Sequence, residues 1–572
     1  MSASDKKKLR KELNNAALTE KQKKEQQEAR KLKAYTLTFA IVMILVVAIV
    51  VGVVVTPLIE GAISRNSHAV NIGEHKLSAA ELTYFYKDAI SEYQEKIYNQ
   101  YYEQFGNYWT IALGFDPDKA LDEQDYVPTG EDAKDDSIKT WADYFINKAI
   151  ENAKDMYSLY DEANAQQFKL DEEAQKEMDT YFDSLDMYAS YYGYSSVKSY
   201  LRSNYGVGAT EEGYRTYYSV CEMASAFLQN YADKLEYKTD DYRAYEAAKL
   251  DEDKFDRYAT VSYVTYSMDI ESYYPADKKA ADLSTEEKDA ARTALKSDME
   301  QVLKSEIKDK ESFDKAIQAL AVNQKDKDGK ELADDKKPTA TEKKYQFFEG
   351  MILHAGALEW LKSADSKAGD VKAFEVYSYP QHEDANHEHG DDCGCARTTD
   401  GYTIVLLTNR YDNKVNMANV RHILVEFKAN ATDADKQAAK AEAEKLLQQW
   451  KDGTANEDSF AELANKESDD QDGKVTNGGL YEDIGLGQMV EPFEDWCFAE
   501  GRKAGDTGIV ETVYGYHVMY YSSTDVMTYR DFLIENDLRT EDTEKWHDGL
   551  VEKLAFEIVS LDNMEYDFVL NG

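Results

Sequence analysis

The chain has 572 residues, and at about 100–200 residues per domain this length predicts three or four domains. Its 67 Lys and Arg against 110 Asp and Glu give a formal net charge of −43, which excludes nucleic-acid binding through a broad basic surface. A hydrophobic content of 42% excludes a wholly disordered chain, and four cysteines are too few for a disulfide scaffold.

The N-terminal region pairs a basic segment with a long uncharged one. Residues 1–33 carry 11 Lys and Arg against 5 Asp and Glu, and residues 34–59 form a run of 26 without a charge. About 20 apolar residues in a helix cross the ~30 Å hydrocarbon core of a bilayer. The pattern predicts a cytosolic tail over 1–33, a single transmembrane helix over 34–59 and an extracytoplasmic remainder. A cleavable signal peptide is the alternative, although its apolar run is usually 7–15 residues and no clear A-x-A site follows.

A tyrosine-rich helical region is expected over residues 68–250. It opens with a short hairpin turning at Gly73, followed by Ser78 and Glu81, a capping-box pair that starts a long helix. Further helical periodicity covers most of the region, and a shorter helix is expected from Asp240. The tyrosines have two interpretations: ordinary helix packing, or an amphipathic surface for unfolded chains.

Two later stretches share one order of elements. Each begins with a β-branched strand, continues with a Lys/Ala/Glu-rich helix and a shorter helix, contains Lys-Ala-Gly-Asp and ends in a Gly-Tyr strand. Order and offsets predict a tandem pair of α+β domains over residues 259–410 and 417–524, each with a small antiparallel sheet. The charged stretch Lys325–Lys344 is expected to be a loop of the first copy.

The second copy places His422 on its first strand and His517 on its last, where neighbouring strands can bring them together. Asp470 lies between them in the sequence, followed by GGL (478–480), GQMVEPF (487–493) and YGYHV (514–518). These ordered motifs resemble the parvulin-type peptidyl-prolyl cis/trans isomerases. The fold class expected for the whole chain is therefore α+β multidomain, with a transmembrane helix, a helical chaperone-like domain and two parvulin-like domains.

The resemblance implies roles for individual residues. His422 and His517 correspond to the paired active-site histidines, and Asp470 to a residue beside the reacting peptide bond. Thr512 corresponds to a threonine bonded within the histidine network, and Tyr514 to a position that is Ser in some members. The proline pocket would be formed by Leu480, Met489 and Phe493, with Gln488 at its edge. No cofactor is required.

The expected chemistry needs no bond to be made or broken. Rotation about an X–Pro bond opposes a barrier of about 18–20 kcal/mol and takes tens to hundreds of seconds unassisted. A dry pocket that clamps the proline ring, with a polar residue acting on the swinging carbonyl, lowers that barrier. About 4 kcal/mol corresponds to roughly a thousandfold acceleration.

The first copy is expected to be degenerate. Alignment of the copies places Tyr263 opposite His422, Thr403 opposite His517, and Leu353 and Ala357 opposite the apolar pair of the pocket. An insertion over residues 381–397 is rich in His and Cys. Its composition suits Zn or Cu, and a flexible acidic loop is the alternative. The candidate ligands are His382, His387, His389, Cys393 and Cys395.

The whole chain resembles extracytoplasmic foldases of the PrsA and SurA type, whose helical domain includes the C-terminal segment, here residues 525–572. The resemblance implies a membrane-anchored isomerase and chaperone that acts on unfolded secreted polypeptides containing X–Pro. Two alternatives remain open: a holdase that binds peptides without turnover, and an extracellular metal-binding protein acting through the insertion 381–397.

Overall fold

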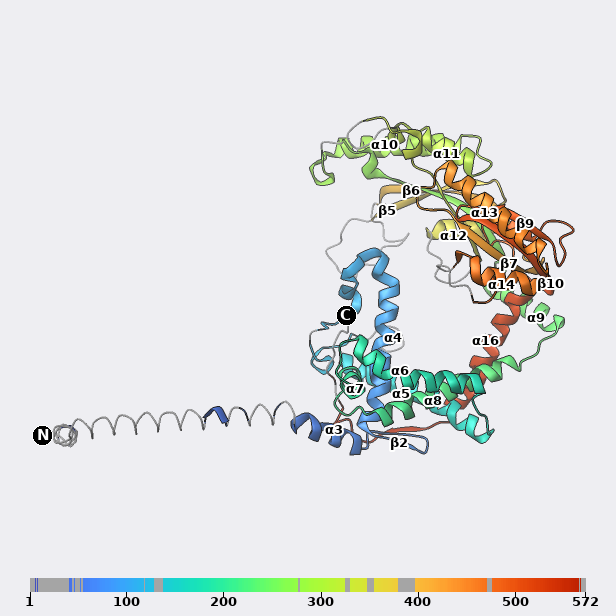
Figure 1. The fold of residues 1–572 in the computed structure, drawn as a ribbon. Helices are drawn as coiled ribbons and strands as arrows, with labels where there is room; N and C mark the ends of the chain where they lie inside the picture. Colours follow the sequence, from blue (N-terminus) through green and yellow to red (C-terminus); the bar gives the residue numbers. More distant parts are fainter. Residues whose placement is uncertain are drawn as a thin grey trace, which may run out of the picture. The chain divides into compact units, whose positions relative to one another are not determined.

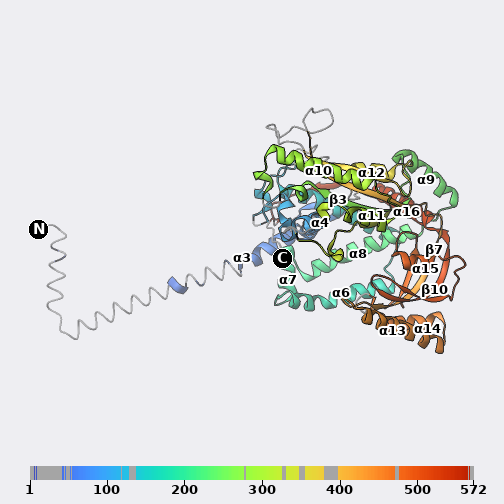
Figure 2. The ribbon, with the colours of Figure 1, turned by 90° about the horizontal axis from the view of Figure 1, so that it is seen from above.

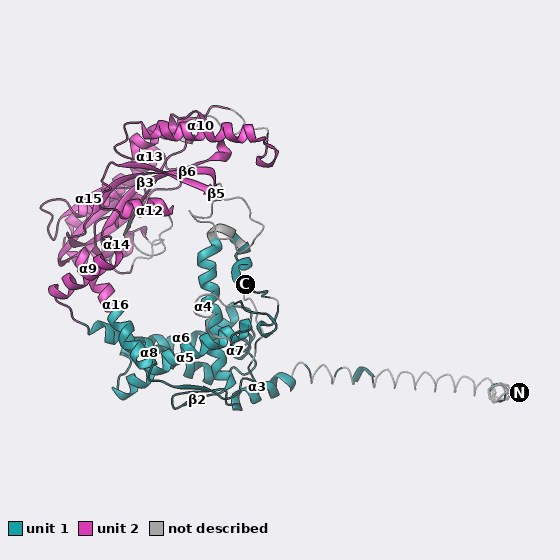
Figure 3. Cartoon of the chain, turned by 180° about the vertical axis from the view of Figure 1, so that it is seen from behind, with its two compact units in different colours: residues 1–235, 540–572 teal, residues 236–539 magenta. Residues whose placement is uncertain are grey.

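The chain forms two compact units in the computed structural model, residues 1–235 with 540–572 and residues 236–539 (Figure 3). The architecture is multidomain α+β, as the sequence predicts, with a helical region and two sheet domains (Figure 1). The structure describes isolated positions before residue 55 and then these ranges: 55–117, 119–127, 137–275, 278–324, 330–346, 354–378, 397–470, 476–564 and 566.

The expected membrane span lies mostly outside the described residues. Of residues 34–59, the structure describes 41–43, 46, 52 and 55–59. In the part of the chain that is described, no helix has both the length and the apolar character that a bilayer crossing requires. Helix α3 (Thr56–Asn66) begins at the end of the expected span, with a proline in its first turn.

The first unit is built on a hairpin and a long helix. Strands β1 (Val70–Ile72) and β2 (His75–Leu77) turn at Gly73, and the Ser78 hydroxyl accepts a hydrogen bond from the Glu81 backbone N–H at the start of α4. This capping box satisfies free donors of the first turn, as the sequence predicts. The other helices of this unit are α4 (Ala79–Phe105), α5 (Trp141–Ala165), α6 (Glu172–Tyr191), α7 (Val197–Tyr205) and α8 (Glu211–Asp233).

The C-terminal segment is not helical throughout. Helix α16 (Tyr529–Val551) is followed by β11 (Phe556–Ile558), which pairs antiparallel with β1 and completes a three-stranded sheet. The expectation of a helical segment over 525–572 is therefore wrong at both ends, because 525–528 also belong to a strand. The β1 edge presents unpaired backbone groups, and the returning chain satisfies them.

The tyrosines of the helical region are buried in some places and exposed in others. Tyr84 and Tyr214 are buried, and their rings pack with Tyr205 between α4, α7 and α8. At the end of α6, by contrast, Tyr191 and Tyr192 are 80% and 62% exposed. The buried tyrosines pack between helices, and Tyr191 and Tyr192 form an aromatic patch in contact with solvent.

The second unit contains two four-stranded antiparallel sheets of one design. Their strand orders are β4-β3-β6-β5 and β8-β7-β10-β9, so each strand of one has a counterpart in the other. The first copy consists of β3 (Thr260–Asp269), α10 (Thr285–Leu303), α11 (Lys310–Gln318), β4 (Thr341–Gln346), α12 (Ala355–Lys362), β5 (Val371–Ser378) and β6 (Thr398–Tyr411). The second consists of β7 (Asn416–Glu426), α13 (Asp433–Asp452), α14 (Glu457–Glu467), β8 (Leu480–Ile484), α15 (Glu491–Cys497), β9 (Thr507–Glu511) and β10 (Gly515–Thr528).

Two boundaries differ from the sequence-based expectation. The stretch Lys325–Lys344 is not a loop throughout, because β4 begins at Thr341 and pairs with β3. Helix α9 (Thr239–Asp253), expected within the helical region, belongs to the compact unit of the sheets.

Helices cover the two faces of the second sheet differently. Ile423 of β7 and Val518 of β10 pack against α13 and α14, which lie together on one side of the strands (Figure 2). Val420 of β7 and Met519 of β10 pack against the short helix α15. Because side chains alternate along a strand, every second residue of β7 faces α15. This is the face that carries His422.

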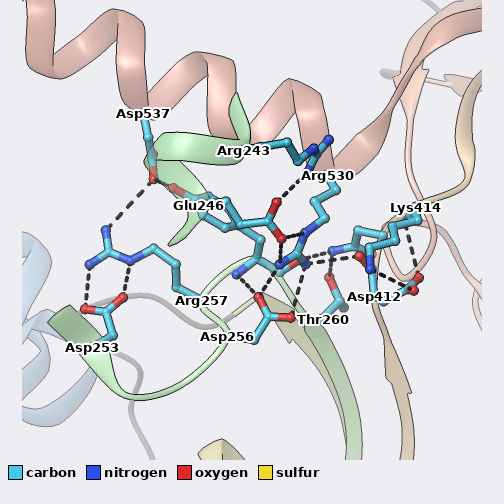
Figure 4. A network of polar contacts seen from close by, with 12 residues as sticks. Arg243, Glu246, Asp253, Asp256, Arg257, Thr260, Asp412, Lys414, Arg530 and Asp537 are labelled. Carbon is cyan, nitrogen blue, oxygen red and sulfur yellow. Dashed lines mark hydrogen bonds and ion pairs between the residues drawn. The ribbon is translucent and has the colours of Figure 1, made fainter. Parts of the chain in front are cut away.

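A buried arginine, Arg530, connects α16 with α9 and with the link between the two sheets (Figure 4). Arg530, the second residue of α16, donates to Glu246 of α9 at 2.8 Å and to both carboxylate oxygens of Asp256, at 2.8 and 3.1 Å. It also donates to the backbone carbonyl of Asp412, in the link between the sheets, at 3.1 Å. A single guanidinium therefore ties α9, α16 and the interdomain link together.

Candidate active site

The two histidines meet on one face of the second sheet. Strands β7 and β10 are hydrogen-bonded neighbours, and their register pairs His422 with Met519 and His517 with Leu424. The histidines are thus diagonal neighbours on the same face, a spacing that long side chains can bridge. Their Nδ1 atoms lie 3.1 Å apart, and the residues are 2% and 6% exposed.

A threonine at the β9–β10 turn fixes the outer nitrogen of His517. Thr512 Oγ1 lies 2.9 Å from His517 Nε2 and accepts a hydrogen bond from the Tyr514 backbone N–H at 3.1 Å. Burial, assisted by the neighbouring His422, lowers the pKa of His517 from 6.5 to about 4. His517 is therefore neutral at physiological pH. The Tyr514 ring is exposed, so this residue contributes its backbone to the network.

The aspartate is positioned by a segment that runs along the edge of β7. After α14, Ser468 accepts a hydrogen bond from Leu424 N at 3.1 Å, and Asp469 N donates to Leu424 O at 2.9 Å. Asp470 follows, and its Oδ2 lies 3.2 Å from His422 Nε2. The His422 nitrogen is buried and the geometry is not aligned enough for a hydrogen bond, so the contact is electrostatic in this structure.

These contacts indicate which atoms of the histidine network donate hydrogen bonds and which accept them. An ionised carboxylate only accepts hydrogen bonds, so with Asp470 charged the proton of His422 belongs on Nε2. His422 Nδ1 then accepts from His517 Nδ1–H, and His517 Nε2 accepts from the Thr512 hydroxyl. The chain is consistent with two neutral imidazoles, in agreement with the lowered pKa of His517.

An aromatic wall closes over the imidazoles. Phe493 of α15 is 3% exposed, and its ring makes edge-to-face contacts with His422 and His517, with centroid distances of 5.6 and 5.4 Å. Met489, just before α15, is half-buried against the same cluster. The structure therefore brings together five of the predicted residues, His422, Asp470, His517, Thr512 and Phe493, with Met489 beside them.

Leu480 is not one of them. In β8, Leu480 pairs with Arg421, on the sheet face that α13 and α14 cover, whereas Tyr481 pairs with Val420 on the face of His422. The Tyr481 ring lies edge-to-face on His422 at 4.6 Å, and its hydroxyl donates to Asp470 Oδ2 at 3.0 Å. The expectation of a Leu480 wall is off by one residue, and on a strand one residue exchanges the two faces.

Gln488 is engaged elsewhere too. Its side-chain carbonyl accepts from Gly485 N at 2.6 Å, and its amide donates to the Tyr529 hydroxyl of α16 at 2.8 Å. Gln488 thus holds the loop before α15 in place. The prediction that it borders the proline pocket finds no support in these contacts.

An open groove adjoins the network. It has a volume of about 730 Å³, and its wall includes Thr512, Val513 and Pro492. Two lysines also line it: Lys428, which follows β7, and Lys436 of α13. The groove meets the histidine network at Thr512, the partner of His517.

The first copy lacks this arrangement. Tyr263 occupies β3 at 0% exposure and packs with Ala357, Val405 and Phe374, so apolar side chains fill the corresponding face. Leu353 and the candidate ligands His382, His387, His389, Cys393 and Cys395 lie outside the described residues.

The remaining cysteines have unreactive surroundings. Burial raises the pKa of the Cys221 and Cys497 thiols to about 12. No cluster of three or more metal-ligating side chains occurs within the ranges that the structure describes.

The segment that contains this site is similar to a known protein family. Residues 402–523 match the PPIC-type PPIASE domain. The foldase protein PrsA 1 of Listeria innocua is 37% identical over 100 residues, which cover 18% of this chain and 28% of that protein. PrsA of Exiguobacterium sibiricum is 24% identical over 269 residues, or 46% of this chain and 71% of its own. The chain spans between 28% and 38% of the length of the Listeria foldases.

Solved structures give the same names at low overall similarity. The peptidylprolyl isomerase PrsA of Bacillus anthracis is 24% identical, with 25% of this chain and 59% of that chain covered and a TM-score of 0.17. A SurA-like chaperone of Campylobacter jejuni is 25% identical, with 24% and 53% covered and a TM-score of 0.14.

Proposed function

Since residues 402–523 form a parvulin-type peptidyl-prolyl isomerase domain, we propose that the whole protein is a foldase that accelerates cis/trans isomerisation of X–Pro bonds in unfolded polypeptides. The observation that carries the proposal is the buried pair of imidazoles, 3.1 Å apart, with the Asp470 carboxylate at one end. Such a reaction requires no cofactor, because no covalent bond is made or broken.

The proposed mechanism uses desolvation and a fixed field. A proline ring placed against Phe493 and Met489 leaves water, so the planar, charge-separated amide loses the solvent that stabilises it. The buried histidine network lines the site, and Asp470 beside it supplies a charge that acts on the rotating carbonyl. His422 and His517 thus shape and polarise the site without attacking the substrate.

We further propose a chaperone surface on the helical unit. The support is the exposed patch at the end of α6, where Met187, Tyr191 and Tyr192 are 64%, 80% and 62% exposed. Large aromatic bodies with polar tips bind varied apolar segments without a fixed sequence. A single membrane span over residues 34–59, with residues 1–33 cytosolic, completes the proposal and rests on the charge pattern of the sequence. The clients are then secreted polypeptides outside the membrane.

A protease-coupled assay on a chromogenic X–Pro tetrapeptide tests the isomerase, and aggregation of a denatured reporter protein tests the chaperone. His422→Ala should abolish isomerisation and leave aggregation suppression intact. Replacing Tyr191 and Tyr192 with Ser should do the reverse. If the wild-type chain suppresses aggregation and isomerises no faster than His422→Ala, the protein is a holdase without turnover.

A further inference from the structure

Tyr481 makes two kinds of contact with the site. Its hydroxyl donates to Asp470 Oδ2 at 3.0 Å, and its ring lies edge-to-face on His422 with centroids 4.6 Å apart. The ring also lies 6.3 Å from that of Phe493, so Tyr481 belongs to the aromatic wall. One side chain on β8 therefore contacts the acid, an imidazole and the apolar wall.

We propose that Tyr481 is a positioning residue of the isomerase site, which holds the Asp470 carboxylate against His422 and thereby fixes the field at the rotating peptide bond. The role rests on the proposed isomerase function. It deepens that function by naming a residue that neither the sequence motifs nor the matched family description singles out.

The case rests first on a shared atom. The Asp470 oxygen that accepts from Tyr481 is the one that lies 3.2 Å from His422 Nε2. The His422 contact is poorly aligned and does not by itself orient the carboxylate. The Asp470 side chain is 20% exposed, so it is not fixed by burial alone. The phenol ties its Oδ2 to a strand of the sheet.

The hydroxyl is suited to the task because it remains a donor. Burial and the nearby Asp470 raise the pKa of Tyr481 to about 12, so the phenol keeps its proton at physiological pH. A leucine or phenylalanine at this position would preserve the apolar wall and remove this hydrogen bond to the acid. The tyrosine combines both functions in one side chain.

The test is the kinetics of the full chain with Tyr481→Phe, which keeps the ring and removes only the hydroxyl. Isomerisation of the X–Pro tetrapeptide should lose about tenfold in kcat/KM, mostly in kcat, as expected for one hydrogen bond to a charged group. Asp470→Asn, which removes the charge, should lose at least a similar factor, and the double variant little more than Asp470→Asn alone, since both changes act through the same carboxylate.

The pH profile distinguishes positioning from packing. Among the residues that the structure describes, the titratable groups that face Asp470 are Tyr481 on β8, His422 on β7 and His517 on β10. The phenol's hydrogen bond favours the ionised carboxylate, so its removal should move the acid limb of kcat/KM to higher pH.

Tyr516→Phe is the matched control. Tyr516 packs on the opposite face of the sheet and also donates to a carboxylate, that of Glu511 at 2.7 Å. It should keep the wild-type rate and profile. An active wild type with an unchanged Tyr481→Phe variant, or equal losses in both tyrosine variants, overturns the role of Tyr481. A wild-type chain without activity overturns the proposed function itself.

Discussion

At the scale of single residues, the site contains an imidazole that burial keeps uncharged, that of His517. His517 has its pKa lowered to about 4, first by burial and second by the neighbouring His422. Protonating it inside the fold would place a positive charge in a nearly dry environment. The unfolded chain has no such restriction and takes up the proton near pH 6.5. Folding is therefore opposed by acid in this window.

The first prediction follows from that linkage. Between pH 6.5 and 4 the unfolded state binds a proton at His517 that the folded state does not, so the free energy of unfolding falls as the pH falls. His517→Gln removes this contribution. Urea unfolding at pH 7 and pH 4.5 should show a smaller loss for the variant than for the wild type. Equal losses in the two proteins would contradict the assignment of His517 as a buried neutral base.

The sequence predicted the polar residues of the site better than its walls. The sequence places His422 and His517 on the first and last strands of the second copy, and the family resemblance adds Thr512. Tyr481 faces the site in place of the predicted Leu480. The physical reason is that strand register decides which of two adjacent side chains faces the site. The preceding Gly478 and Gly479 have no side chains that would indicate which residues of β8 face the site. The run Leu480–Ile484 (LYEDI) shows no alternation of apolar and polar residues that would decide between the two faces.

At the scale of elements, the loop before α15 is held from several sides. Glu494, 6% exposed, accepts from Gly487 N at 2.6 Å and lies 3.5 Å from Lys344 of β4. A Cβ on Gly487 would lie 2.7 Å from Thr260 Cγ2 of β3, and its φ of +87° also favours glycine. The first sheet domain thus packs against the loop that carries Met489.

The second prediction concerns Glu494. Its replacement by Ala leaves the Gly487 N–H and Lys344 without their acceptor and should destabilise the second unit by about 1–3 kcal/mol. Isomerase activity should fall as well, since the loop carries Met489. Glu491→Ala, at an exposed position of the same helix, is the control and should change neither property. Equal stability of the two variants in urea unfolding would refute the role of Glu494.

The third prediction concerns the buried arginine of Figure 4. Arg530 is 5% exposed, and Arg530→Met leaves Glu246 and Asp256 without their shared cation. Breaking a buried pair in this way costs about 3–5 kcal/mol. Lys414→Met is the matched control, because Lys414 and its partner Asp412 are both more than 60% exposed. If both variants unfold at the wild-type denaturant concentration, Arg530 does not tie the elements together.

Elements that depend on distant partners were not predicted from the sequence. Strand β4 has Lys343 and Lys344 beside Glu342, a charged run typical of a loop, and it is recognisable only through its pairing with β3. Arg530 likewise binds residues 118 to 284 positions away. The start of α4 was predicted from the sequence, because Ser78 and Glu81 form a local capping box. Local chemistry determines that boundary, and long-range pairing determines the others.

At the scale of the whole molecule, the chain returns at its C-terminus to the unit in which it began. Strand β11 pairs with β1, Gly73 N donates to Ala555 O, and Met564 is buried in the core around α4. The second unit, with the isomerase site, is inserted between the two parts of this helical unit. Each unit has its own core, so each should lose stability separately.

The fourth prediction tests that separation. Deletion of residues 552–572 removes β11 and the buried Met564, and it should lower the unfolding temperature of the helical unit. Tetrapeptide isomerisation should stay at the wild-type rate, because every contact of the site lies in residues 236–539. Circular dichroism melting and the coupled assay on the same samples give both results. Parallel loss of activity would show that the units are not separable.

The most direct test of the central claim is exchange NMR on an X–Pro peptide mixed with catalytic amounts of the full chain. The wild type should bring the separate cis and trans proline signals into exchange within seconds, and His422→Ala and His517→Ala should each return them to the slow uncatalysed rate. Exchange that is as fast with both alanine variants as with the wild type would contradict the account, since the paired imidazoles would then not be the site of isomerisation.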